Sequence, residues 1–395
     1  MNIIDRRQAL TITPILRLAF RPFFLAGAIL ALLAVPIWIL AHTGKITYLP
    51  AGSWLAWHRH ELVFGFAGAI VTGFLLTAGQ TWTGQPGLSG KPLLALFVLW
   101  LAARVLWFIP SALPVLLVVD ALFYPTVAWC MWLMVGKVKQ YRNYPIVGVL
   151  LLLGVANIVS LYDLYQGGEL IQRNAALSAL FLVAALMTVI GGRVIPFFTR
   201  RGLLREEGVE PWVWLDNALL VGMVLLALAT LTGFNLQQNI LMGILLCALA
   251  IGHGIRAFRW YDKGIWRVNL LWSLHLSYWW LVIACSALAA WHFSLLNNFS
   301  SAIHSFTIGA MSGMILAMLA RVTLGHTGRK LEPPKFMVIA FISLNIAAFC
   351  RIFVVELNAI AGWHSATTFW VLSFALFVIG YTPMLCKARV DGNPG

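Results

Sequence analysis

The segment Trp57–Glu61 gathers three side chains that can bind a metal ion or carry a proton. His58, His60 and Glu61 stand within four consecutive positions, in a chain of 395 residues with only 9 histidines and 13 acidic residues. Residues two apart on an α-helix point roughly 200° away from each other. His58 and His60 can therefore bind one ion only if the segment is a turn, and in a helix they serve different centres. His58 and Glu61, three apart, share a helix face.

Composition predicts the elements that position these residues. Hydrophobic residues make up 61% of the chain and charged residues 10%, and apolar runs repeatedly exceed the length that crosses a bilayer. Lipid offers no partner for a free backbone amide, so each run must be a helix. We expect an all-α polytopic membrane protein, a single transmembrane helical domain over residues 1–395. The twelve expected helices are 20–42, 59–79, 91–109, 112–135, 145–165, 174–198, 212–232, 238–258, 267–291, 299–322, 334–356 and 364–386.

Basic residues predict the orientation of the bundle. The net charge is +14, but with the N-terminus inside, all but five of the 27 basic residues fall on the inner side. The five are Lys45, Arg59, Arg104, Arg173 and Arg351. This bias places both termini in the cytoplasm and predicts lipid, not nucleic acid, as the partner. Arg6-Arg7 precedes an apolar stretch too long for a cleaved signal.

Helix direction assigns most histidines to one of two depths, at about 1.5 Å per residue. His304, five residues into its helix, lies roughly 8 Å below the outer surface that also holds His58 and His60. His253, His275 and His326 belong to the inner half. A histidine buried in lipid faces the bundle and has a partner, and an interhelical hydrogen bond accounts for one alone as well as a metal does. His42, His292 and His364 sit at outer helix ends and receive no role.

Two kinds of residue on the inner side could hold a flat cofactor. Tyr278 lies one helical turn from His275, and aromatic walls around an imidazole suit a porphyrin as well as they suit plain packing. Arginine forks match the carboxylates that such a cofactor carries. The candidates at the inner rim are Arg193, Arg256, Arg321 and Arg329, although topology alone also favours arginine there. The five cysteines are Cys130, Cys247, Cys285, Cys350 and Cys386; they are scattered singly and predict neither disulfides nor covalent haem attachment.

Several segments together resemble the NnrS family, bacterial inner-membrane proteins associated with nitric oxide metabolism. The matching segments are Phe20-Arg21-Pro22-Phe23-Phe24, Trp57-His58-Arg59-His60-Glu61 with Phe64-Gly65-Phe66, Gly73-Phe74-Leu75-Leu76-Thr77-Ala78 with Trp82-Thr83-Gly84, Gly192-Arg193-Val194-Ile195-Pro196-Phe197-Phe198-Thr199, and Arg321-Val322-Thr323-Leu324-Gly325-His326-Thr327-Gly328-Arg329. They span nearly the whole chain. Relatives often carry methionine after the glutamate, where this chain has Leu62, so the resemblance does not extend to a thioether copper ligand there.

The resemblance implies haem b, a copper ion and a role in relieving nitrosative stress in the bacterial inner membrane. It singles out as metal ligands the six histidines His58, His60, His253, His275, His304 and His326. We expect His58, His60 and His304 to form the outer metal site and His275 to be a haem ligand. Glu61 is the candidate catalytic residue, because it can orient a histidine, ligate a metal or relay protons.

Three functions remain open from the sequence. The first is an enzyme or scavenger that acts on nitric oxide or nitrosylated metal species and takes electrons from an unknown donor. The second is a proton-coupled transporter of a metal or small anion, since twelve helices with intramembrane His and Glu suit a carrier. The third is a sensor or metal-delivery factor without turnover.

Overall fold

The computed structural model describes residues 10–394, and within them every regular element is helical. Arg6 and Arg7 lie outside the described residues. The α-helices are α2 (Phe20–His42), α3 (Trp54–His60), α4 (Gly68–Thr83), α5 (Gly90–Leu106), α6 (Leu113–Ala121), α7 (Phe123–Lys137), α8 (Tyr144–Tyr165), α9 (Leu170–Gly202), α10 (Val213–Leu231), α11 (Ile240–Arg259), α12 (Asn269–His292), α13 (Phe299–His304), α14 (Gly313–His326), α15 (Lys335–Phe349), α16 (Val355–Leu357) and α17 (Ala359–Cys386). Three π-helical stretches interrupt them, η2 (Glu61–Ala67), η7 (Ser305–Ser312) and η8 (Cys350–Val354).

The first and last described helices indicate whether the number of membrane crossings between them is odd or even. Of the described helices, eleven continuous stretches are long and apolar enough to cross a membrane, and α5, with 17 residues, is slightly shorter. Arg21 at the start of α2 donates to the carbonyls of Leu385 and Lys387 at the end of α17, at 2.7 and 2.8 Å. The first helix therefore begins on the side where the last one ends, which requires an even number of crossings. With α5 as the twelfth, the predicted count agrees.

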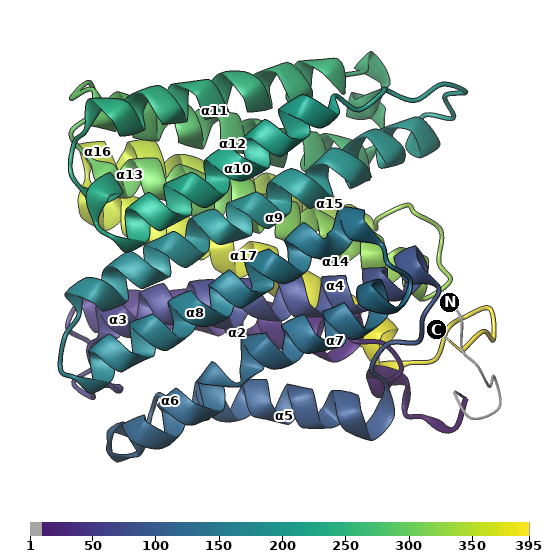
Figure 1. The fold of residues 1–395 in the computed structure, drawn as a ribbon, viewed down its shortest axis with the longest axis horizontal. Helices are drawn as coiled ribbons and strands as arrows, with labels where there is room; N and C mark the ends of the chain where they lie inside the picture. Colours follow the sequence, from purple (N-terminus) through teal and green to yellow (C-terminus); the bar gives the residue numbers. More distant parts are fainter. Residues whose placement is uncertain (1–9, 395) are drawn as a thin grey trace. The chain divides into compact units, whose positions relative to one another are not determined.

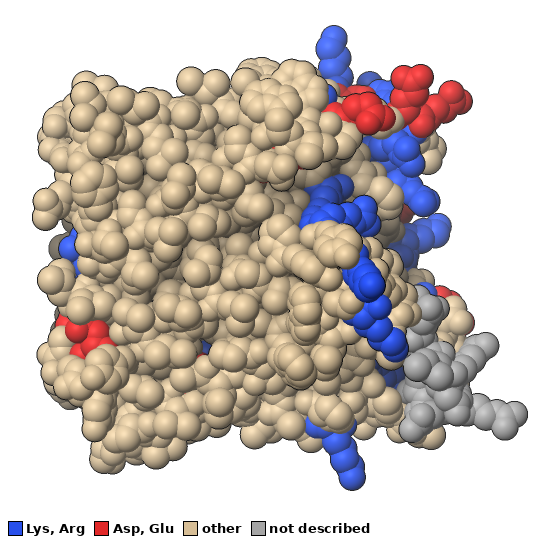
Figure 2. Space-filling model, viewed as in Figure 1, with Lys and Arg blue, Asp and Glu red and all other residues tan. Residues whose placement is uncertain are grey.

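The described chain divides into two compact units. Unit 1 comprises the chain up to Ala179, Val322–Lys330 and the stretch from Phe377 onward, and unit 2 comprises Leu180–Arg321 and Leu331–Leu376. The expectation of one domain over residues 1–395 stays a prediction. Figure 1 shows the helices along the chain, and on the face drawn in Figure 2 most Lys, Arg, Asp and Glu side chains lie near helix ends, with long faces between them that carry few charges. Such faces suit contact with lipid.

Within unit 1, α2 packs against α4 and η2, and α7 packs against α4 and α8. The short helix α6 lies against α5 and α8. Within unit 2, α12 packs against α11 and η7, and α15 also contacts η7. Small residues permit these contacts: a Cβ at Gly313 would lie 2.6 Å from the Ser277 hydroxyl of α12. Close approach of this kind is typical of helix pairs in membranes.

Two of the π-helical stretches begin directly after candidate histidines. η2 starts one residue after His60, and η7 starts one residue after His304. Side chains satisfy backbone carbonyls in η2, where Tyr124 donates to Phe64 and Trp100 to Gly65, each at 3.1 Å. Single π-helical turns inside α-helices are rare and concentrate at functional sites. The π-helical backbone therefore occurs next to His60 and His304, two of the residues that their types already made candidates for a functional site.

Candidate functional site

The Trp57–Glu61 segment is helical, which decides between the two predicted alternatives. The Ser53 hydroxyl accepts a hydrogen bond from the Ala56 amide at 3.1 Å and caps α3. His58 stacks on Trp38 with ring centroids 4.8 Å apart and planes at 19°. His60 is completely buried and contacts a different set of residues. The imidazole rings of His58 and His60 therefore point into different surroundings, as helical geometry requires.

His60 lies at the centre of a buried polar group that we call the His60 cluster, comprising His60, Glu61, Arg104, Asp120 and Asn157. The His60 Nδ1 atom is 3.1 Å from Glu61 Oε1, and Nε2 is 2.8 Å from Asn157 Oδ1 and 3.3 Å from Asp120 Oδ2. Arg104 contacts both carboxylates, with Nε 2.8 Å from Glu61 Oε2 and Nη2 2.8 Å from Asp120 Oδ2. All five side chains are buried. Glu61 thus pairs with His60 and Arg104.

Sequence reasoning missed three members of this cluster. Arg104, Asp120 and Asn157 come singly from α5, α6 and α8, so no spacing motif connects them. The only available signal was that each is a polar or charged residue inside an apolar run, and such residues normally face the bundle interior with a partner. The charge pattern of the sequence singles out Arg104 only as one of the five basic residues that do not fall on the inner side of the membrane.

His304 ends α13 and is half-buried in unit 2. Its Nδ1 donates to the Ser300 carbonyl at 2.7 Å, so in a neutral ring the lone pair is on Nε2. The neighbouring Ser300 hydroxyl accepts from Arg351 at 2.8 Å. His58, His60 and Glu61 belong to unit 1, so the expected outer site with His304 stays a prediction.

Unit 2 contains the second candidate site, on the packed helices α11 and α12. His253 is completely buried, and its Nδ1 lies 2.6 Å from the Tyr278 hydroxyl. Its Nε2 is also buried and has no hydrogen-bond partner among residues 10–394. Buried polar atoms without a partner are rare, and each calls for an explanation such as a missing water, ion or cofactor. His253 therefore offers one oriented imidazole nitrogen to a ligand.

His275 lies one turn before Tyr278 on the same face of α12, as its spacing predicted. Its Nε2 is 2.8 Å from the hydroxyl of Thr199 on α9. That hydroxyl donates its only hydrogen to the Ile195 carbonyl, also at 2.8 Å. Thr199 must then accept from His275, so Nε2 carries the hydrogen and, in a neutral ring, Nδ1 has the lone pair.

Arg256 lies one turn after His253 on α11. It donates to the Thr188 carbonyl at 3.1 Å and pairs with Asp216 at 3.1 Å, while its guanidinium stacks on Trp260, 4.6 Å from the ring centroid. Its Nη1 is buried without a partner among the described residues. Gly192 permits this approach, because a Cβ there would collide with the guanidinium. The Gly191-Gly192 step thus positions an arginine beside the imidazole.

The remaining predicted residues are divided between the units. In unit 2, Arg321 is buried with its guanidinium 4.0 Å from the Phe198 ring centroid, and Arg193 is half-buried on α9. In unit 1, His326 lies beside Phe20 with ring centroids 5.4 Å apart, and Arg329 donates to the Thr327 carbonyl at 3.4 Å. The structure therefore brings His253 and His275 to neighbouring helices, whereas His326 belongs to the other unit.

His292, to which no role was given, has an ordinary structural environment. Its Nδ1 accepts from the Asn239 amide at 3.1 Å, and its Nε2 lies 2.9 Å from Asn235 Oδ1. One donor and one acceptor satisfy a neutral imidazole fully. His292 is therefore a useful internal control for the other buried histidines.

Among residues 10–394, no three or more His, Cys, Asp or Glu side chains are grouped so that they could hold a metal ion. A haem needs fewer protein ligands, since one histidine can hold its iron. The donor set around His253 fits that requirement, with one buried free nitrogen, aromatic neighbours and a nearby arginine. The histidines do not assemble into a metal cage of their own.

These features define a polytopic α-helical membrane protein with histidine, arginine and carboxylate side chains buried between its helices. A family model described as NnrS protein matches residues 14–389, nearly the whole chain. The chain belongs to the NnrS family, and this membership supports a role in processes that involve nitric oxide. No curated protein matches the chain closely enough to add to this.

Proposed function

We propose that this protein binds haem b in unit 2 through His253 and acts on nitric oxide or nitrosylated species in the bacterial inner membrane. The observation that carries the proposal is the buried, unpartnered Nε2 of His253, with its other nitrogen held by Tyr278. A ligating histidine usually fixes its second ring nitrogen with a hydrogen bond, which sets the tautomer and the ring orientation.

The residues around His253 suit a haem for a second reason. Tyr278 and Trp260 provide aromatic surfaces, with ring centroids 4.8 Å apart, and Arg256 has one buried nitrogen without a partner. Arginine binds carboxylates through paired N–H groups, so Arg256 is the candidate partner for a haem propionate, with Arg321 as the second. His275 offers its Nδ1 lone pair and is the alternative iron ligand.

Bound haem would supply an iron that binds a diatomic ligand, and the apolar bundle around it controls access and excludes water. Nitric oxide is small and apolar, so it can enter from the bilayer without a charged channel. The electron donor, and the copper that the resemblance implies, stay predictions. Copper is the less supported of the two cofactors because His60 has both ring nitrogens engaged.

The test is the optical spectrum and iron content of the purified full-length protein, for the native chain, His253→Ala and His292→Gln. We expect stoichiometric haem in the native chain and in His292→Gln, and loss of most of it in His253→Ala. A His253→Ala protein that keeps the native haem content would contradict the assignment, and would direct attention to His275.

Turnover is a separate question with its own measurement. Anaerobic consumption of nitric oxide by the haem-loaded protein with an electron donor would support an enzyme, whereas stoichiometric uptake without turnover would support a scavenger or sensor. Haem-free protein that moves copper or a small anion across vesicles would instead favour the transporter.

A further inference from the structure

Both ring nitrogens of His60 face hydrogen-bond acceptors. Nε2 lies 2.8 Å from the amide oxygen of Asn157, and Nδ1 lies 3.1 Å from a carboxylate oxygen of Glu61. A neutral imidazole has one N–H and one lone pair, so it can satisfy only one of these two neighbours as a donor. The geometry therefore requires one more proton than a neutral ring carries.

The orientation of the Asn157 amide does not depend on His60. Its Nδ2 donates to the backbone carbonyl of Asp120 at 3.1 Å, and a carbonyl can only accept. The amide oxygen is thus the atom that faces His60, and the Nε2 of the ring must carry a hydrogen. Asp120 Oδ2 lies 3.3 Å from the same nitrogen, within ion-pair distance.

The other nitrogen leads to the same conclusion. Glu61 Oε2 lies 2.8 Å from Arg104 Nε in an ion pair, which stabilises the ionised carboxylate. With Glu61 ionised, Nδ1 can only donate to it. A proton on Glu61 would remove the negative charge that pairs with Arg104, so the extra proton belongs on His60.

Charge counting supports the extra proton. Glu61 and Asp120 carry two negative charges, and Arg104 alone carries one positive charge, so the buried cluster would have a net charge of −1 with a neutral His60. An uncompensated charge buried away from water is very costly. The Oδ1 atom of Asp120 has no hydrogen-bond partner among the described residues, and Oδ2 is the atom near Arg104 and His60. A proton on His60 brings the total to zero.

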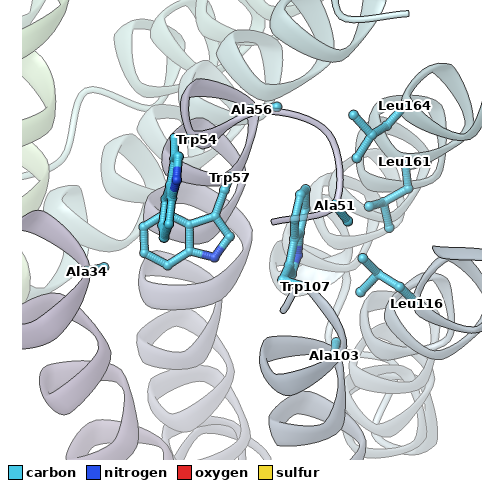
Figure 3. Packing of buried hydrophobic residues seen from close by; sticks show 10 residues of the cluster. All are labelled: Ala34, Ala51, Trp54, Ala56, Trp57, Ala103, Trp107, Leu116, Leu161 and Leu164. Carbon is cyan, nitrogen blue, oxygen red and sulfur yellow. The ribbon is translucent and has the colours of Figure 1, made fainter. Parts of the chain in front are cut away.

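Apolar side chains of unit 1 lie beside the His60 cluster. Trp107 lies 4.8 Å from the His60 ring between centroids, and Trp57, Leu116 and Leu161 belong to the same buried hydrophobic cluster (Figure 3). His292 shows the contrast, because it has one donor and one acceptor and needs no extra proton. The two histidines are comparably buried but have opposite hydrogen-bonding requirements.

We propose that the Trp57–Glu61 motif binds a proton and not a metal ion, and that His60 is an imidazolium held between Glu61 and Asp120. This replaces the sequence-based expectation of His60 as a metal ligand, since an imidazolium has no lone pair to offer. The proposal is independent of the haem in unit 2. It assigns to this chain a buried proton-binding site inside a membrane-spanning segment.

The first test is ¹⁵N NMR of the full chain labelled at histidine, in detergent at neutral pH. The His60 signal is assigned by its loss in His60→Gln, and His292 serves as the neutral reference. We expect both nitrogens of His60 to be protonated, and Glu61→Gln to return His60 to the neutral ring. A native His60 with one unprotonated or metal-shifted nitrogen would overturn the proposal.

The second test uses thermal unfolding and does not depend on assignment. His60→Gln leaves the cluster at −1, whereas His60→Gln combined with Glu61→Gln returns it to zero. We expect the single variant to lose about 5 °C in Tm and the double variant to recover part of that loss. A double variant less stable than His60→Gln would contradict a protonated His60.

Metal content separates this proposal from that of haem binding. Iron and copper per folded His60→Gln protein should equal the native values. Loss of either metal from a monodisperse His60→Gln sample that still unfolds cooperatively would overturn the proton site, and would leave the assignment of His253 untouched.

Discussion

His275 donates a hydrogen bond from Nε2 to the hydroxyl of Thr199, 2.8 Å away, because Thr199 donates its own hydroxyl hydrogen to the Ile195 carbonyl. The threonine thereby selects one tautomer of a buried histidine on a neighbouring helix. This hydrogen bond also ties α9 to α12 within unit 2. His275 lies one turn from Tyr278 on α12, and Tyr278 also contacts His253. The two candidate iron ligands, His253 and His275, are therefore both positioned by residues around α12.

Thr199→Val tests this relationship with a substitution of nearly equal volume. It leaves the buried Nε2–H of His275 without an acceptor, so we expect a loss of about 1–3 kcal/mol in the free energy of unfolding. Thr188→Val on the same helix removes only a hydroxyl that bonds to its own helix, at the Ala184 carbonyl. Equal destabilisation by the two variants would show that the Thr199–His275 bond contributes little.

Tyr278→Phe removes the hydroxyl that holds His253 Nδ1 and keeps the aromatic ring. Loss of such a supporting group typically weakens metal binding by about 10- to 100-fold, so we expect weaker haem retention and a shifted absorption spectrum. The control is Tyr124→Phe, which removes a hydroxyl bonded to the Phe64 carbonyl in unit 1. A native spectrum in Tyr278→Phe would argue against His253 as the iron ligand.

Gly192→Ala tests how Arg256 is positioned. A Cβ at Gly192 would collide with the guanidinium and displace it from the Thr188 carbonyl. We expect lower stability by about 1–3 kcal/mol, as for other overpacked sites, together with weaker haem binding. Gly148→Ala is the matched helical control, because nothing lies within 4 Å of its added Cβ. Unchanged haem content in Gly192→Ala would show that Arg256 does not contribute to haem binding.

A salt bridge outside the membrane-spanning segments gives a pH dependence. Arg205 contacts Asp262 through two hydrogen bonds, at 2.9 and 3.0 Å, and joins two loops of unit 2. The Arg205 hydrogen bond, followed by one from the Gly264 amide, lowers the pKa of Asp262. The contribution of the pair is therefore complete above the ordinary pKa of an aspartate and is lost as the pH falls through the lowered pKa.

Limited proteolysis near Glu206 and Glu207 measures this loss. An acid-active protease should nick the loop faster as the pH falls below the ordinary carboxyl range, and Asp262→Asn should be nicked readily without that pH dependence. Because the pair is exposed, the effect should be small and should weaken in high salt. Cleavage of the native loop that does not change with pH would contradict this role.

The sequence predicted the helices much better than the contacts between them. Apolar length alone predicted 20–42, and α2 spans the same residues, because in lipid an apolar run has only the helical option. The helical phase also showed that His58 and His60 could share one ion only if their segment were a turn, and the segment is helical. The His60 cluster could not be predicted, since Asp120 and Asn157 are isolated residues whose convergence depends on which helix faces pack.

Irregular backbone also limits what the sequence can predict. The π-helix that begins at Glu61 changes the phase of the side chains that follow it. No residue pattern in the sequence announces such a turn. In unit 2 the regular helices kept their predicted phase, and there His275 and Tyr278 lie one turn apart as expected.

The most direct test of the account is metal content measured in parallel on folded His253→Ala and His60→Gln proteins. We expect His253→Ala to lose its haem iron and His60→Gln to retain native iron and copper. The opposite result, with metal lost from His60→Gln and retained in His253→Ala, would contradict the division between a cofactor site in unit 2 and a proton site in unit 1.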